Sequence, residues 1–378
     1  MPKCDICFVG LENLPVLAPE YNQLGAGGEQ VQQTLLSKAL IRHGYSVAMI
    51  VLDHGQPDGA SWDGVTTWRA YKPMAGIYGL RFIYPRWTGI WQAMARADAR
   101  TYYVSCAGMR VGLAALFCRR HGRRLVFRAA HDTDCQPHNL LIHYARDRKL
   151  YEYGLKRADA ILTQSLRQQA DMREFYHRDS TVAGMFVEAP ARVLPFAERD
   201  IDILWVNNLA AFKRPDLVVE LARRLPDRRI VMIGGTQAGA DGLERMVRRE
   251  AAGLPNLEFL GSVPYHQVND YYARARLFVN TSDSEGFPNS YLQAWVRGTP
   301  LVAFFDPDGV IVREGLGAAP ADMDGMVVSV QNLLTDACAW EETGQRARDF
   351  MARNFADDEI LRPYLAACVT AGGSGAGS

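Results

Sequence analysis

The chain alternates short β-rich runs with helical patterns, and it starts this alternation twice. In the first half the expected strands are residues 5–9, 46–52, 66–70, 101–105, 125–129 and 160–163. Between the first two strands, apolar residues recur with helical spacing over 28–43, and Gly44 ends the pattern. Strands that alternate with helices are typical of a parallel sheet covered by helices on both faces.

The second alternation begins after residues 186–200, which carry two prolines and no clean period and so read as a linker. Strands are expected at 202–206, 229–233, 257–260, 277–281 and 301–305, and helices at 214–225, 242–252, 266–275 and 289–297. A chain of 378 residues suits two domains. We therefore predict an α/β protein with Rossmann-like, doubly wound domains at 1–185 and 201–355 that face a cleft. A helix that packs back on the first domain and a Gly/Ser tail occupy 356–378.

Polar residues follow the strand expected at 277–281, at the edge where open α/β sheets bind ligands. Glu285 can accept hydrogen bonds from sugar hydroxyls, and Gly286 allows close approach of the backbone. Pro288 is expected as the first residue of the next helix, whose free N–H groups suit a diphosphate. Without further support, an ordinary strand–turn–helix with an exposed acid explains the same residues.

Residues 284–303, from Ser284-Glu-Gly-Phe-Pro-Asn onward, resemble the donor-site signature of family 4 glycosyltransferases, retaining enzymes of the GT-B fold. The resemblance implies that Glu285 contacts the donor sugar and that position 293 holds the ribose, although this position is Gln and not the usual Glu. Residues 203–222 resemble the first strand and helix of the family's donor domain. There Lys213 matches a cation that neutralises the departing diphosphate, Asn208 stands where an Arg is usual, and Arg214 is a substitute.

Looser matches lie in the first half and in one loop of the second. Gly27 and Gly28 resemble the family's glycine loop, where Glu29 and Gln30 depart from the usual pair, and His131 resembles a His near the reacting sugar. The loop 259–265 resembles the one that flanks the nucleotide base. The expected catalytic residues are His131, Lys213 and Glu285. The expected donor-binding residues are Gly27, Gly28, Asn208, Lys213, Arg214, Val263, Glu285, Gly286, Phe287, Pro288, Asn289, Ser290 and Gln293.

The resemblance implies a hexosyltransferase that moves a sugar from a UDP- or GDP-sugar to a hydroxyl of a glycan or lipid-linked acceptor, with retention, in cell-envelope polysaccharide or glycoconjugate synthesis. It implies no cofactor beyond this co-substrate and no metal, so Asp132 and Asp134 are read as polar cleft or solvent residues. Two alternatives remain open: a sugar-nucleotide epimerase or hydrolase, and a catalytically weak binding subunit, which Asn208 and Gln293 favour.

Charge is unevenly divided: residues 1–185 hold 23 Lys and Arg against 16 Asp and Glu, and the rest holds 19 against 26. The basic first domain can meet an anionic membrane through residues 81–96, by insertion of Trp87 and Trp91, or through the arginines of 119–124. Alternatively, both segments are buried helices with solvated basic ends. Nucleic acid is not expected, since no reading helix accompanies the charge. The chain start lacks a secretory pattern, and no apolar run reaches the roughly 18 residues of a membrane span. We expect a cytoplasmic protein, peripheral at the inner face of the membrane if it binds there, with seven unpaired cysteines.

Overall fold

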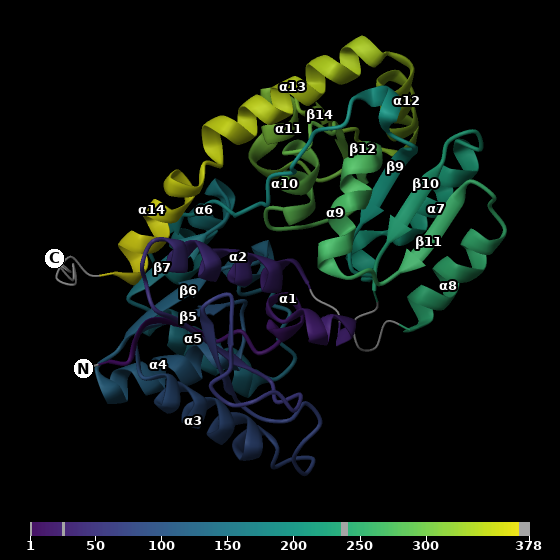
Figure 1. The fold of residues 1–378 in the computed structure, drawn as a ribbon. Helices are drawn as coiled ribbons and strands as arrows, with labels where there is room; N and C mark the ends of the chain where they lie inside the picture. The colour runs from purple at the N-terminus through teal and green to yellow at the C-terminus, as the bar shows by residue number, and fades with distance from the viewer. Residues whose placement is uncertain (1, 25–26, 236–240, 370–378) are drawn as a thin grey trace. The chain divides into compact units, whose positions relative to one another are not determined.

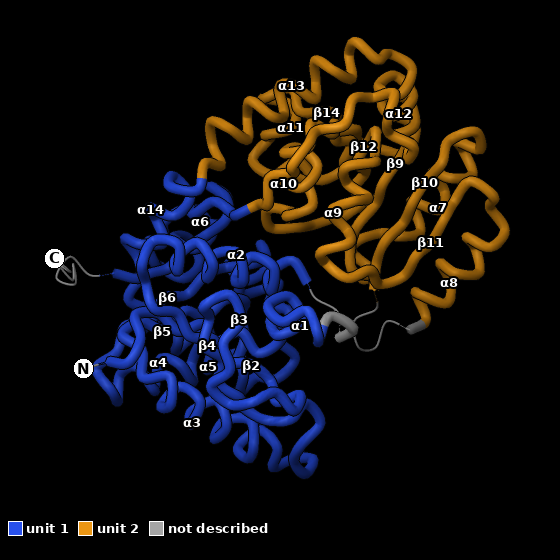
Figure 2. Tube along the Cα trace, in the orientation of Figure 1, with its two compact units in different colours: residues 1–186, 357–378 blue, residues 187–356 orange. Residues whose placement is uncertain are grey.

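The computed structural model describes residues 2–24, 27–235 and 241–369 (Figure 1). Gly25 and Ala26 of the expected glycine loop and the Gly/Ser tail from Thr370 lie outside the described residues. The chain forms two compact units, residues 1–186 with 357–378 and residues 187–356 (Figure 2).

Unit 1 is built on an eight-stranded sheet in the order β3-β4-β2-β1-β5-β6-β7-β8. Its strands are β1 (Cys4–Phe8), β2 (Val47–Val51), β3 (Ser61–Trp62), β4 (Val65–Arg69), β5 (Ala99–Ser105), β6 (Arg124–Arg128), β7 (Ala160–Thr163) and β8 (Thr181–Val182). All neighbours pair in parallel except β3 with β4. The strand order reverses between β1 and β5, which is the arrangement of a doubly wound sheet.

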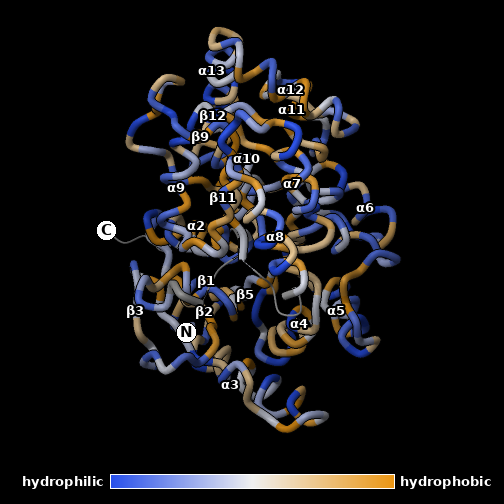
Figure 3. Tube along the Cα trace, turned by 90° about the vertical axis from the view of Figure 1, so that its right-hand side faces the viewer, coloured by the Kyte–Doolittle hydropathy of each residue, from blue (hydrophilic) through white to orange (hydrophobic). Residues whose placement is uncertain are grey.

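Helices cover both faces of this sheet (Figure 1). They are α1 (Leu14–Leu17), α2 (Gly28–Arg42), α3 (Thr88–Ala97), α4 (Met109–His121), α5 (Ala145–Arg157), α6 (Leu166–Tyr176) and α14 (Asp357–Cys368), with shorter turns at η1 (Pro19–Leu24), η2 (Phe82–Trp87) and η3 (Asp132–Cys135). Residues of α3, α4 and α5 form one core with Cys7, Ala48 and Ile50 of the strands. The apolar strands β1 and β2 lie among the hydrophobic stretches of Figure 3, as burial on both faces requires.

Unit 2 has a six-stranded parallel sheet in the order β11-β10-β9-β12-β13-β14. Its strands are β9 (Ile201–Val206), β10 (Ile230–Ile233), β11 (Leu257–Gly261), β12 (Ala275–Asn280), β13 (Leu301–Ala303) and β14 (Gly317–Ala318). The helices are α7 (Pro215–Arg224), α8 (Asp241–Ala252), α9 (Tyr265–Arg274), α10 (Asn289–Trp295), α11 (Val310–Glu314), α12 (Met323–Thr335) and α13 (Ala337–Asn354), with η4 (Phe196–Glu198), η5 (Ala211–Lys213) and η6 (Pro307–Gly309). Apolar residues of α7, α8 and α12 share one core with the sheet. The strand order reverses between β9 and β12.

The fold class is as predicted, and the long strands lie within two residues of their expected bounds. Three two-residue strands, β3, β8 and β14, are absent from the prediction because so short a segment carries no periodic signal. The expected linker is wrong in part: it contains η4, and Arg199 behind it is 1% exposed within unit 2. Within the described parts of the chain, no helix is both long and apolar enough to cross a membrane.

Candidate functional site

The reversal of strand order in unit 2 places two loops side by side at the carboxyl edge of the sheet. The loop after β9 leads to Lys213, and the loop after β12 leads to Glu285. Because connections leave β9 and β12 toward opposite faces, a crevice opens between such loops, and open α/β sheets bind ligands there. Topology alone therefore selects the same two loops as the sequence motifs.

Lys213 and Glu285 form an ion pair across this edge. Their side chains are 13% and 8% exposed, so both charges lie largely out of water. Ser282 Oγ donates to Glu285 Oε1 at 2.7 Å, which fixes the carboxylate. Lys213 is also the only lysine between positions 157 and 378, in a half of the chain whose other cations are arginines. A compact ammonium held against a carboxylate is a preorganised contact for an anionic ligand that carries hydroxyl groups.

The Lys213 loop is tied to the end of β12 by backbone and side-chain hydrogen bonds. Thr281 Oγ1 lies 2.8 Å from the carbonyl oxygen of Lys213 and 3.0 Å from that of Arg214, and it accepts a bond from Trp205 Nε1 at 3.0 Å. Asp283 N donates to Phe212 O at 2.8 Å. Thr281 and Trp205 are fully buried, so the pairing of the two loops is built into the core. Neither residue was singled out from the sequence.

Arg214, the expected substitute cation, is committed to other partners. Its guanidinium bonds both oxygens of Asp216, with Nη2 to Oδ2 at 2.9 Å, and lies 3.6 Å from Asp283. Its backbone is left-handed (φ 49°), which turns the chain into α7 at Pro215. Asn208 is half-buried after β9 and carries no charge. Of Asn208, Lys213 and Arg214, Lys213 is therefore the residue that places a cation against Glu285.

Gln293 lies in a buried polar cluster that the sequence motif did not reveal. Its side chain is 5% exposed, donates to Tyr265 Oη at 3.3 Å, and accepts from Arg297 Nη1 at 3.1 Å. Tyr265 Oη donates to Glu188 Oε2 at 3.1 Å, and Asn269 Nδ2 donates to the same oxygen at 3.2 Å. Burial and the neighbouring Glu188 raise the pKa of Tyr265. The exposed carboxylate of Glu188 thus lies close to position 293, where the family usually has a Glu.

Two signals could have found this cluster. Arg297 is four residues after Gln293 within the helix expected at 289–297, which is a standard pairing distance. Tyr265 ends the loop that was expected to flank the nucleotide base, in which Val263 is half-buried. Glu188 could not be found, since 77 positions separate it from Tyr265.

The residues from Gly286 to Ser290 form the turn into α10. Pro288 is the N-cap and not the first helical residue, so this prediction is wrong by one position. Phe287 packs against the rings of Trp295 and Phe355, and the centroid of each ring is 6.3 Å from its own. Its side chain therefore belongs to an aromatic cluster of unit 2. Gly286 and Pro288 are buried, and Asn289 and Ser290 are half-buried. The helix has seven residues, shorter than the nine expected, because the chain turns at Val296 toward Gly298 (φ +63°).

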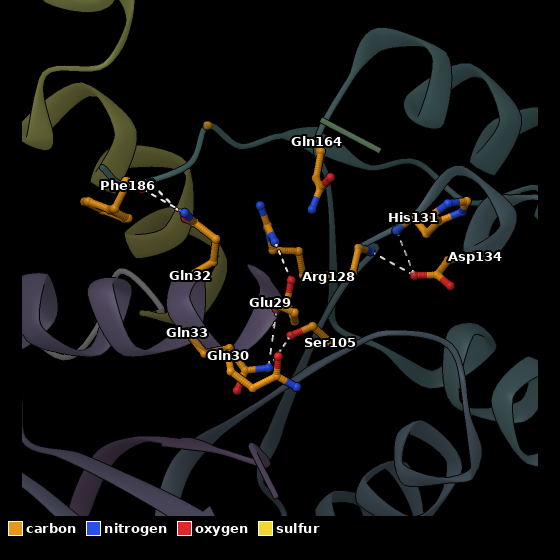
Figure 4. A network of polar contacts seen from close by, with 12 residues as sticks. Glu29, Gln30, Gln32, Gln33, Ser105, Arg128, His131, Asp134, Gln164 and Phe186 are labelled. Carbon is orange, nitrogen blue, oxygen red and sulfur yellow. Dashed lines mark hydrogen bonds and ion pairs between the residues drawn. The ribbon is translucent and has the colours of Figure 1, made fainter. Parts of the chain in front are cut away.

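In unit 1 a second polar cluster joins the start of α2 to the ends of β5 and β6 (Figure 4). Arg128 is 1% exposed and its Nη1 lies 3.1 Å from Glu29 Oε2. Gln33 Nε2 donates to Glu29 Oε1 at 3.3 Å and to Ser105 Oγ at 2.7 Å. Gly27 N donates to Gln30 Oε1 at 3.0 Å, so Gly27 caps the helix that Gly28 begins. Glu29, which departs from the family pattern, has a partner of its own in Arg128.

His131 also lies at this end of β6, as the N-cap of η3. Its Nδ1 accepts from Thr133 N at 3.2 Å, which orients the ring. Asp134 Oδ2 accepts from the backbone N of Ala130 at 2.8 Å and of His131 at 3.2 Å. Asp132 and Asp134 are 5% and 7% exposed, so their reading as solvent residues is wrong, while their reading as cleft residues stays a prediction. Asp134 thus holds the turn that carries His131, and Asp132 Oδ1 accepts from Gln168 Nε2 at 3.0 Å.

Comparison with known proteins agrees with this architecture. Residues 200–336, which include the Lys213–Glu285 pair, match the family model described as Glycosyl transferases group 1. A D-inositol 3-phosphate glycosyltransferase of Geodermatophilus obscurus is 35% identical over 127 residues, which are 30% of this chain and 28% of that protein. The matched region is thus less than a third of the length of that relative.

Solved structures match over nearly the whole chain. Sucrose-phosphate synthase from Thermosynechococcus elongatus has a TM-score of 0.74 at 18% identity, covering 95% of this chain and 96% of that chain. HepE from Anabaena, in complex with UDP and glucose, has a TM-score of 0.71 at 14% identity, covering 96% and 98%. The fold is therefore GT-B, as predicted. The match to the glycosyltransferase family model covers residues 200–336 of unit 2.

Proposed function

We propose that this protein transfers a sugar from a nucleotide-sugar donor, UDP- or GDP-linked, to a hydroxyl of a glycan or lipid-linked acceptor, with retention of configuration. The observation that carries the proposal is the Lys213–Glu285 pair at the strand-order reversal of unit 2, inside the segment that matches the family model. The bound UDP of the HepE structure supports a nucleotide donor.

In this proposal Lys213 stabilises negative charge on the departing diphosphate, and Glu285 accepts hydrogen bonds from hydroxyls of the transferred sugar. The two side chains neutralise each other. A diphosphate competes for the ammonium, and sugar hydroxyls replace it at the carboxylate. The pair thus avoids two unpaired buried charges, which would be strongly destabilising.

The nucleoside end is proposed to lie at the Gln293 cluster. Gln293 and Glu188 offer an amide and a carboxylate to the two hydroxyls of a ribose, and Tyr265 holds both in place. His131 is proposed to line the reacting sugar from unit 1, on the resemblance of its position to the family.

The donor is identified by thermal shift. Addition of UDP, GDP, ADP and TDP and of their sugar conjugates should raise the melting temperature for one base, because ligands that bind only the native state stabilise it. A screen in which no nucleotide raises the melting temperature at millimolar concentration contradicts the proposal.

Substitution Lys213→Ala tests the mechanism. Loss of a preorganised charge that faces the leaving group should cost about 2.7 to 4 kcal/mol, a fall in kcat of about 10²- to 10³-fold. The matched control is Arg223→Ala, which removes a cation of the same unit from an exposed pair with Glu250. Activity of Lys213→Ala within twofold of the parent removes Lys213 from the mechanism.

A second candidate, a catalytically weak donor-binding subunit, is favoured by Asn208, where the family carries a cation. It predicts a full thermal shift with the nucleotide sugar but no turnover with any acceptor. Turnover without an acceptor instead indicates a hydrolase or epimerase. Product analysis with radiolabelled donor separates these outcomes.

A further inference from the structure

The exposed apolar side chains of the protein are concentrated in one segment of unit 1, residues 72–84, here called the 72–84 loop. Within it, six large apolar or aromatic residues are at least 60% exposed: Met74 (86%), Ile77 (74%), Tyr78 (84%), Leu80 (62%), Ile83 (60%) and Tyr84 (72%). Scattered exposed apolar residues are ordinary, but a contiguous group of them marks an interaction surface.

The stretch of sequence that contains this loop carries charge of one sign. No Asp or Glu occurs between Asp63 and Asp98, whereas this stretch carries the five cations Arg69, Lys72, Arg81, Arg86 and Arg96. Arg69 and Arg96 are paired with Asp53 and Asp58. In the described parts of the chain, no carboxylate forms an ion pair with the remaining three. The surface therefore combines apolar side chains with uncompensated positive charge.

The loop is a folded element and not an open coil. The backbone N–H groups of Leu80 and Arg81 donate to Ile77 O at 3.0 and 2.8 Å, and Tyr84 N donates to Leu80 O at 3.1 Å. Gly76 (φ +101°) sits so close to the turn that a Cβ there would lie 2.7 Å from Pro85 Cδ. A backbone N–H or C=O group without a hydrogen-bond partner costs several kcal/mol when it moves from water into lipid. The internal hydrogen bonds of the loop remove this cost for the groups that form them.

A neighbouring segment extends the surface. The guanidinium carbon of Arg146 lies 3.3 Å from the ring centroid of Phe82 and 5.7 Å from that of Tyr144. Tyr144 is 61% exposed. Tyr144 is thus a third exposed tyrosine in addition to Tyr78 and Tyr84 of the loop, and amphipathic rings of this kind favour the headgroup level of a bilayer.

Trp87 and Trp91, in contrast, pack against the core of unit 1 and are half-buried, so membrane insertion through them, expected from the sequence, has less exposed apolar surface behind it than insertion through the 72–84 loop. The basic stretch 119–124 is also partly engaged. Arg123 pairs with Asp98, and Arg124 Nε donates to Ala367 O at 2.6 Å.

We propose that the 72–84 loop is a membrane-docking element that inserts its apolar tip into the headgroup region of an anionic phospholipid bilayer, with Lys72 and Arg81 against the lipid phosphates. An acidic protein partner fits the charge but does not call for six exposed apolar side chains. Binding of a neutral apolar partner would not require that the stretch between Asp63 and Asp98 lack acidic residues. The inference goes beyond the proposed function and is independent of the donor chemistry.

The test is co-sedimentation with vesicles of phosphatidylcholine, with or without phosphatidylglycerol. The parent should bind the anionic vesicles, and more weakly as salt rises, because the Debye length falls below about 10 Å above 0.1 M. The triple variant Ile77→Ser/Leu80→Ser/Ile83→Ser should lose at least tenfold in partitioning. The variant Lys72→Gln/Arg81→Gln should lose roughly 30-fold at low salt, about fivefold for each cation.

Two matched controls keep the result specific. Val312→Ser/Val328→Ser removes side chains 66% and 54% exposed in unit 2, and Arg119→Gln/Arg120→Gln removes two exposed cations of unit 1. Both should bind vesicles within twofold of the parent, and all variants should keep their nucleotide-dependent thermal shift. A parent that fails to sediment, or controls that lose as much as the loop variants, overturns the proposal. The proposal is also overturned if the parent is a dimer that binds no vesicles and the triple variant is a monomer.

Discussion

At the scale of single residues, Asp134 is a buried acid whose ionisation is coupled to folding. Burial raises its pKa to about 6, while hydrogen bonds from the backbone of Ala130 and His131 act in the opposite direction. Between about pH 4 and 6 the folded protein therefore keeps a proton that the unfolded chain has released. The contribution of Asp134 to the free energy of unfolding falls as the pH rises through this interval, by up to about 3 kcal/mol, and is then constant.

We expect Asp134→Asn to remove this part of the pH dependence. An amide cannot ionise, and its oxygen still accepts from the backbone. Urea unfolding of parent and variant at intervals from pH 4 to 7 measures the difference in slope. Asp179→Asn, at a position 89% exposed, is the control and should follow the parent. Parallel curves for the parent and Asp134→Asn would contradict the prediction.

Gln293 shows how a neighbour changes what a substitution means. Glu at this position would put a carboxylate about 3 Å from the guanidinium of Arg297, which is 3% exposed and whose pKa burial lowers. We expect Gln293→Glu to fold and to bind nucleotide about as well as the parent or up to roughly fivefold more tightly, since charge-assisted bonds are about twice as strong as neutral ones.

Titration calorimetry with the nucleotide found by thermal shift checks this expectation. In an Arg297→Gln background the same change should be destabilising, because the new carboxylate has no buried cation beside it. Loss of nucleotide binding in Gln293→Glu alone would show that position 293 is not at the ribose.

At the scale of elements, the long strands were predictable because buried parallel strands are continuous apolar runs, as in Val47–Val51. In the candidate site, Lys213 and Glu285 could be selected from the sequence because each lies in a local motif, and their roles stay predictions. Their partners Thr281 and Trp205 were not, since they meet only when β9 and β12 pair. Sequence reasoning found what is local and missed what tertiary pairing assembles.

The segment 186–200 illustrates the same limit. Its two prolines suggested a linker, yet Arg199 anchors it to unit 2. The guanidinium donates to the carbonyl oxygens of Leu194, Ala275 and Arg297 at 2.9, 2.6 and 2.7 Å, and to Thr299 Oγ1 at 2.6 Å. Burial lowers the pKa of Arg199 to about 10.

We expect Arg199→Ala to destabilise unit 2 by about 3 to 5 kcal/mol. The change leaves several buried acceptors without donors and opens a cavity over the Trp340 ring, whose centroid is 4.7 Å from the guanidinium. Denaturant unfolding followed by tryptophan fluorescence measures it. Arg192→Ala, which removes a cation 65% exposed in the same segment, should cost less than about 1 kcal/mol. Equal costs for the two variants would mean that Arg199 anchors nothing.

At the scale of the whole molecule, the chain passes between the units twice, after Phe186 and after Ala356. The last helix, α14, belongs to unit 1, although it follows all of unit 2. Thr101 Oγ1 donates to Cys368 O at 2.7 Å, and Tyr364 Oη donates to Gly184 O at 2.7 Å. Completion of unit 1 therefore requires the end of the chain, and unit 1 can finish folding only after unit 2 has been synthesised.

This connectivity makes Tyr364 a reporter of unit 1 alone. It is 2% exposed and packs near the rings of Tyr103 and Phe186, with centroids 6.4 and 6.1 Å away. Tyr364→Ala should destabilise unit 1 by about 3 to 5 kcal/mol, and Tyr364→Phe, which removes one hydrogen bond, by about 1 kcal/mol. Hydrogen exchange should accelerate in β5 and β6 while β9 and β12 stay protected, and added nucleotide should protect unit 2 further without rescuing unit 1. Equal acceleration in both units would show that they unfold together, because a cooperative pair must exchange through one shared opening.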